Sequence, residues 1–182
     1  MAEPVRLAKL LVLVPALCVL AACGRAPAAQ RALPVADGAP EPAPWSTAAA
    51  SLGGLDPCAL LSPADRSTAG LTELGKPKTI GEARACDWTV PSTFGVTVTL
   101  DENAGLANLD VSRGTRTKKK VGAHQALQVT DKKNATGTCA VLLGVGDSAS
   151  VQVDVSNASF SDTTLACSRA ATVAGLVEPK LP

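Results

Sequence analysis

The run Phe94-Gly95-Val96-Thr97-Val98-Thr99-Leu100-Asp101 has the clearest alternation of apolar and polar side chains in this chain of 182 residues. Strict alternation over about four to eight residues is typical of a strand with one buried face. We therefore expect Phe94, Val96, Val98 and Leu100 to face a core and the two threonines to point away from it. This run predicts a fold built on a sheet.

Four other segments predict strands of the same sheet, at residues 86–90, 123–130, 138–145 and 149–156. The third of them is a continuous apolar run, which is expected of a central strand buried on both faces or nearly so. The fourth alternates Val151, Val153 and Val155 with Gln152 and Asp154. The sequence thus predicts about five strands.

Helices are expected before and after these strands in the sequence. Segments 57–61 and 63–70 each begin with proline after a capping residue, Asp56 or Ser62, and residues 104–109 predict a helical turn. Residues 162–177 carry apolar positions at Leu165, Ala166, Ala170, Val173 and Val177 and are followed by Pro179, which predicts a C-terminal helix. The expected fold is α+β, a roughly five-stranded, mostly antiparallel sheet with N- and C-terminal helices on one face.

The amino-terminal residues predict export and lipidation. Two cations precede an uncharged apolar run over residues 10–20, which closes on Leu20-Ala21-Ala22-Cys23. This order describes a secretory signal that is too short to span a bilayer as a helix. Leu-Ala-Ala-Cys also has the form of a bacterial lipobox, so residues 1–22 are expected to be a signal peptide and Cys23 the lipidated first residue of the mature chain. The expected location is the outer face of the cell membrane.

The residues after Cys23 divide into a linker and a folded part. Residues 24–50 hold ten Ala and five Pro, so we expect residues 23–54 to form a flexible tether and residues 55–182 to form the domain. Without the signal peptide the chain is formally neutral, because Arg6, Lys9 and Glu3 are removed with it. A neutral chain argues against a nucleic-acid partner that is held by phosphate neutralisation.

The cysteines of the expected domain predict two disulfides. Four cysteines in an exported chain allow three pairings. We prefer Cys58–Cys86 and Cys139–Cys167, because each bridge would tie a helix start to a strand start. A four-cysteine zinc site is disfavoured, since no two of these cysteines have a Cys-x2-4-Cys spacing.

Several short motifs are spread over residues 55–182: Asp56-Pro57-Cys58, Leu60-Leu61-Ser62-Pro63-Ala64-Asp65, Cys86-x-Trp88, Gly122-Ala123-x-x-Ala126, and a late cysteine that opens the last helix. With the lipobox and linker before them, they resemble a family of small actinobacterial lipoproteins, domain of unknown function 3558. The resemblance implies a lipid-anchored envelope protein with no established activity. It supplies no catalytic residues to carry over.

Few residues suggest catalysis or metal binding. His124 is the only histidine and has no recognisable triad partners around it, so we expect a surface or edge histidine. Asp101-Glu102-Asn103 carries oxygen ligands suited to a cation, but an acidic turn at a strand end is the simpler explanation. Trp88 is expected in the core, with its indole N–H bound to backbone. No cofactor motif was found, and an enzyme is the least favoured class.

One segment is strongly basic, whereas residues 56–110 carry twice as many acids as cations. Between residues 113 and 133 there are seven cations and one acid; the cations are Arg113, Arg116, Lys118, Lys119, Lys120, Lys132 and Lys133. A loop of this charge could contact an anionic membrane or wall polymer. Alternatively it is a solvated loop whose lysines keep an edge strand from pairing with neighbours.

These observations favour a lipid-anchored binding or interaction module of the cell envelope. Its partner would be an envelope protein, a small ligand or an anionic polymer. An accessory or structural subunit is the alternative, and an extracytoplasmic enzyme comes third. A concave apolar pocket around Trp88 and Phe94 would favour binding, whereas a flat sheet face without a cavity would favour the accessory role.

Overall fold

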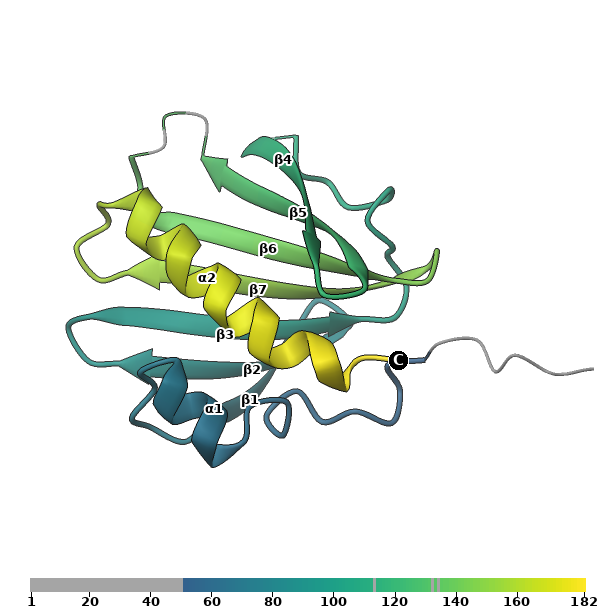
Figure 1. Cartoon of the computed structure of the whole chain (residues 1–182), viewed down its shortest axis with the longest axis horizontal. Helices are drawn as coiled ribbons and strands as arrows, with labels where there is room; N and C mark the ends of the chain where they lie inside the picture. The colour runs from purple at the N-terminus through teal and green to yellow at the C-terminus, as the bar shows by residue number, and fades with distance from the viewer. Residues whose placement is uncertain (1–50, 113, 132, 134) are drawn as a thin grey trace, which may run out of the picture. The chain divides into compact units, whose positions relative to one another are not determined.

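Seven antiparallel strands form one sheet in the order β1-β2-β3-β7-β6-β5-β4 (Figure 1). The structure is a computed structural model that describes residues 51–112, 114–131, 133 and 135–182. The strands are β1 Lys76–Ile80, β2 Ala83–Val90, β3 Phe94–Asp101, β4 Gly114–Val121, β5 His124–Asp131, β6 Thr138–Val145 and β7 Ala149–Asn157. The described residues belong to one compact unit.

The prediction of five strands was wrong by two, since the sheet also contains β1 and β4. Both are edge strands, and β1 is exposed along its whole length. β4 contains part of the basic segment that we expected to be a loop, and it is exposed between its two ends. An edge strand of this kind buries neither face, so its sequence does not alternate between apolar and polar residues.

The N-terminal helix is shorter than expected. Helix α1, Pro63–Thr68, has six residues and buries none of them. Ser62 caps it through a capping box, because its hydroxyl accepts from the Asp65 N–H and the Asp65 carboxylate accepts from the Ser62 N–H. The segments 57–61 and 104–109 contain turns rather than helix, since runs this short do not repay helix nucleation.

The C-terminal helix was predicted correctly. α2, Thr163–Val177, begins at its N-cap Asp162, whose carboxylate accepts from the Leu165 N–H at 2.9 Å. Its apolar face packs on the sheet, although Leu165 itself is exposed. A 3-10 turn η1, Glu178–Lys180, follows. There Lys180 donates to Asp65 at 2.6 Å and, together with the Ser62 hydroxyl, lowers the pKa of Asp65 to about 2.

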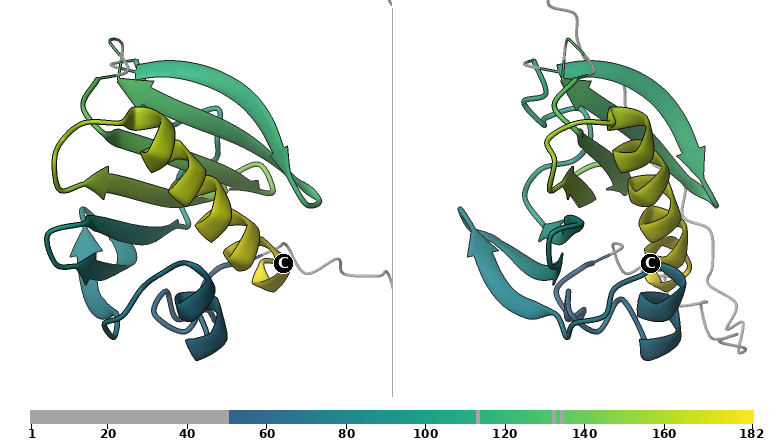
Figure 2. Two further views of the ribbon diagram at one scale, coloured as in Figure 1. Left: turned by 60° about the vertical axis from the view of Figure 1, so that its left-hand side comes forward. Right: turned by 90° about the vertical axis from the view of Figure 1, so that its left-hand side faces the viewer.

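The two faces of the sheet differ. α1 and α2 lie on the same side, and no helix covers the other side in the part of the chain that the structure describes (Figure 2). Register places Val96, Val98 and Leu100 opposite Val155, Val153 and Val151, all on the helix-covered side. These valines and Leu100 are fully buried, as the alternation in β3 predicted.

Two disulfides fasten the helix-covered side, and both match the preferred pairing. Cys58–Cys86 joins the turn before α1 to β2, and Cys139–Cys167 joins β6 to α2. The core also includes Leu52, which is fully buried although it falls in the range expected as linker. Leu52 lies where β2 begins, since its carbonyl oxygen accepts from Arg84 at 2.9 Å.

The expected signal peptide at 1–22, the lipobox, Cys23 and most of the expected linker lie outside the described residues, as do Arg113 and Lys132. Among the residues that are described, none of the helices has the length and apolar character needed to cross a membrane.

Candidate functional site

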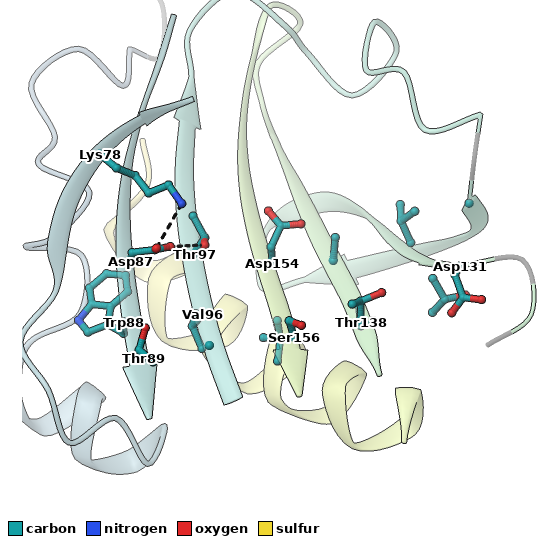
Figure 3. Close-up of a pocket in the computed structure, with 17 residues that line it drawn as sticks. Lys78, Asp87, Trp88, Thr89, Val96, Thr97, Asp131, Thr138, Asp154 and Ser156 are labelled. Atoms are coloured by element: carbon teal, nitrogen blue, oxygen red, sulfur yellow. Dashed lines mark hydrogen bonds and ion pairs between the residues drawn. The ribbon is translucent and has the colours of Figure 1, made fainter. Parts of the chain in front are cut away.

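The helix-free face of the sheet contains a hollow of about 510 Å³ (Figure 3). It lies toward the end of the sheet where β2 ends and β3 begins. Side chains of that face line it from six strands: Lys78 of β1, Asp87 and Thr89 of β2, Thr97 of β3, Asp154 and Ser156 of β7, Thr138 and Ala140 of β6, and Val129 and Asp131 of β5. Seven of these ten side chains carry a hydroxyl or carboxylate group.

Small residues on the floor keep the hollow open. Gly95 of β3 and Ala140 of β6 lie on this face and fill little of it. A Cβ atom on Gly95 would meet nothing closer than the Trp88 carbonyl oxygen, at 3.7 Å, so no neighbour forces glycine there. Gly95 also keeps regular register with Thr89 and Ser156 and forms no bulge. A glycine inside a strand weakens it and often marks a place where a ligand approaches closely.

Another part of the helix-free face, around Gly144 and Ser150, is covered. The segment after β3 crosses it, with Leu106 against Gly144 and the Ala104 carbonyl oxygen accepting from the Ser150 hydroxyl at 2.7 Å. This segment accounts for the burial of Ser150 and Leu142, which point away from α2. The hollow is therefore the part of the face that the segment leaves open.

Two of the three carboxylates in the hollow are engaged. Asp87 pairs with Lys78 at 3.2 Å and also accepts from the Thr97 hydroxyl. Asp131 accepts from the Thr136 hydroxyl at 2.8 Å and from three backbone N–H groups of the following turn. These hydrogen bonds, chiefly that of Thr136, lower the pKa of Asp131. Both groups are held by their own surroundings.

Asp154 differs from them. It lies on the central strand β7, with Thr97 and Ala140 as its register partners. Its Oδ2 accepts from the Gln152 side-chain amide at 2.7 Å, and among the described residues no cation forms an ion pair with it. Burial raises the pKa of Asp154, and the Gln152 hydrogen bond and the charge of Lys78 offset this only in part.

The aromatic residues Trp88 and Phe94 are buried on the helix-covered side of the sheet. Trp88 is 1% exposed, as expected of a core residue. It lies between Asp87 and Thr89 on β2 and borders the hollow, but its register partner is Val96, on the helix-covered side. The expected backbone partner for its indole was wrong, since Nε1 has no hydrogen-bond partner among the described residues. Phe94 is buried under Arg169, whose guanidinium carbon lies 4.0 Å from the ring centroid.

His124 has a structural position at the start of β5. Its Nδ1 lies 2.9 Å from Glu178 Oε1, and its Nε2 lies 3.3 Å from the main-chain oxygen of Pro182. Glu178 also accepts from the Ala123 N–H at 2.8 Å, and these contacts, chiefly that with His124, lower its pKa. The group fastens the β4–β5 turn to η1, and Gly122 in that turn has φ of +53°.

The acidic turn at 101–103 is also explained by local contacts. Asp101 accepts from the N–H groups of Asn103 and Ala104, at 2.9 and 3.1 Å. Glu102 pairs with Arg84 at 2.6 Å. Within the described part of the chain, no three His, Cys, Asp or Glu side chains gather in a way that could hold a metal ion.

The basic residues lie mainly on β4. Register places Arg116, Lys118 and Lys120 on the helix-free side and Lys119 on the other, and all four are exposed. Lys133 is exposed in the turn after β5. The structure therefore gathers Arg116 and Lys118–Lys120 along one edge of the sheet rather than in a loop.

Sequence reasoning missed the hollow. Its signal was present in the polar residues that alternate with the apolar ones, Thr97 in β3 and Asp154 in β7. Register across four strands is needed to bring these residues together, and the sequence pattern does not give it.

Comparison with known proteins gives one match. No curated protein and no solved structure matches the chain. A family model, described as "Protein of unknown function (DUF3558)", matches residues 18–180, which is most of the chain. With its paired cysteines, its Asp-Pro-Cys segment and its late helix, this chain belongs to the DUF3558 family.

Proposed function

We propose that this protein is a lipid-anchored binding module on the outer face of a bacterial cell membrane, and that a small polar ligand binds in the hollow. The observation that carries the proposal is the hollow itself, a recess of about 510 Å³ in the uncovered part of the helix-free face. This volume falls within the range of about 300–1,000 Å³ that is typical of small-molecule sites. Export and lipidation rest on the apolar run that ends at Cys23.

The position of the hollow suits a tethered protein. Leu52, near the first described residue, is held by Arg84 where β2 begins. The hollow lies at the other end of that strand, around Thr89 and Gly95. A domain attached to a membrane through its N-terminal segment would then hold the hollow away from the attachment point.

Binding is favoured over the accessory role because the sheet face contains a hollow, whereas a flat face was expected of an accessory subunit. An enzyme is less favoured because the histidine and one of the carboxylates that could move protons are already engaged. His124 is held by Glu178 at the opposite end of β5 from Asp131, and Asp87 is held by Lys78.

The experiment is a fragment screen on the purified full chain, read by amide chemical shifts. Fragments that bind in the hollow should shift residues such as Thr97, Thr138 and Ser156. Gly95→Val should abolish these shifts, because the new side chain fills the floor where a Cβ is tolerated. Gly54→Val is the matched control, since it makes the same change outside the hollow and a Cβ there meets no atom within 4 Å. Fragments that shift no hollow residue, or that bind the Gly95→Val protein equally well, would refute the site.

The anchor is tested separately. Cys23→Ser should leave the precursor uncut or release the protein from membranes, because a diacylglyceryl group supplies the two chains that stable anchoring needs. An intact mass showing an unmodified mature N-terminus in the unaltered protein would contradict this part of the proposal.

A further inference from the structure

We propose that the ligand of the hollow carries a protonated amine, which forms an ion pair with Asp154, and that nearby hydroxyl groups bind the rest of it. This inference rests on the proposed function, since it names the chemistry of the same site. It depends on three features of the hollow: a carboxylate without a cation, open space beside it, and a ring of hydroxyl groups.

The first feature is the charge. Asp87 and Asp131 are engaged by groups of the protein, whereas among the described residues the only hydrogen-bond partner of Asp154 is Gln152. Lys78, the cation of the lining, is committed to Asp87. A partly buried carboxylate is costly unless a cation compensates it, and burial has raised the pKa of Asp154. An ammonium group on a ligand would supply the compensation that the described chain does not.

The second feature is access. Asp154 Oδ2 accepts from Gln152. Among the described residues, the fully buried side-chain atoms without a hydrogen-bond partner are Trp88 Nε1 and Thr99 Oγ1, so Asp154 Oδ1 is accessible from outside. Figure 3 shows Asp154 facing into the hollow, and its register partners on the two neighbouring strands are Thr97 and Ala140. The small side chain of Ala140 and the missing side chain of Gly95 leave room on the floor beside this carboxylate.

The third feature is the rim. Hydroxyl groups of Thr89, Thr97, Thr138 and Ser156 also line the hollow. Those of Thr97 and Thr138 already bond to Asp87 and Thr136 and are left to accept from a ligand, whereas those of Thr89 and Ser156 can donate or accept. The three carboxylates outnumber the single lysine of the lining, so an anionic ligand is disfavoured. No aromatic ring of the helix-free face lines the hollow among the described residues, so a neutral sugar would have no stacking platform. A small amine with hydroxyl groups fits best.

The test compares amines with neutral analogues of the same shape. Ethanolamine, putrescine and glucosamine are titrated into the full chain beside ethylene glycol, butanediol and glucose. We expect at least one amine to bind about tenfold more tightly than its neutral partner and to shift the amides around Asp154, because charge-assisted hydrogen bonds are about twice as strong as neutral ones. Asp154→Asn should remove about that tenfold preference, while Asp147→Asn, in the exposed β6–β7 turn, should leave it unchanged.

Two outcomes overturn the inference. Either no amine binds better than its neutral analogue, or Asp154→Asn leaves the preference intact. The fragment screen with Gly95→Val separates these failures from failure of the proposed function. If only neutral or anionic fragments occupy the hollow, the site stands and its assignment to amines falls. If no fragment occupies it, both fall.

Discussion

Removing one disulfide should cost this protein a large share of its stability, and the two bridges offer a matched comparison. Cys58–Cys86 and Cys139–Cys167 both span 28 residues, and the two loops do not overlap. In the chain-entropy model, a loop of 28 residues gives about 12 cal/mol/K, or about 3.6 kcal/mol at about 25 °C. We expect each double alanine variant to lose about this amount, because loop length is the same for both.

The loss can be measured by urea denaturation. Trp88 is buried in the core and reports unfolding by fluorescence. With a urea m-value of about 1.8 kcal/mol/M, each midpoint should fall by about 2 M. Because the loops are separate, the losses should add to about 7 kcal/mol, which is comparable with the whole stability of many domains. The variant without either bridge should therefore be marginally folded.

The comparison between the bridges tests the reasoning. Losses below about 1 kcal/mol for both variants would refute loop entropy as the main contribution. A difference above about 2 kcal/mol between them would show that packing around the removed sulfurs outweighs it, since the loop lengths are equal.

Three further predictions concern other parts of the molecule. Gly122→Ala should destabilise the protein by about 1–3 kcal/mol, because φ is +53° and the new Cβ would collide with the Glu178 carboxylate. Gly54→Ala is the control in a urea titration, and equal midpoints for the two variants would contradict the prediction. Asp154→Asn should stabilise the protein at neutral pH. Burial raises the pKa of Asp154, so the unaltered protein gains stability as pH falls through that pKa, and the stability difference between the two proteins should shrink. Urea midpoints measured against pH test this, and a difference that grows on acidification would be the contrary result. If the lysines of β4 contact an anionic surface, the triple variant Lys118→Gln, Lys119→Gln, Lys120→Gln should bind anionic vesicles less tightly and with a weaker salt dependence, with stability changed by less than about 0.5 kcal/mol. Equal vesicle binding would leave these lysines as protection of an edge strand.

The core of the sheet could be predicted because its strands bury one face. β3 and β7 alternate apolar and polar residues, and α2 has a capping residue and an apolar stripe. The two edge strands could not be predicted in this way. β1 contains Pro77 between two lysines and β4 contains three consecutive lysines, so neither shows an apolar face. They are strands because a neighbour offers backbone hydrogen bonds, which is a tertiary effect.

The candidate site was beyond sequence reasoning for a related reason. Thr97 and Asp154 lie 57 positions apart in the chain but are register partners in the sheet. Each alone looks like the solvent-facing residue of an amphipathic strand. Their shared role follows from strand order, which places β7 beside β3 rather than at an edge.

The two-sided strands have an evolutionary consequence. Alternate residues of β2, β3, β6 and β7 belong to the core on one side and to the hollow on the other. A substitution at Thr97, Thr138 or Ser156 changes the hollow without touching a core side chain. If the hollow binds a ligand as we propose, members of a family built in this way could exchange one ligand for another through single substitutions, each nearly neutral for folding, while the scaffold is inherited unchanged.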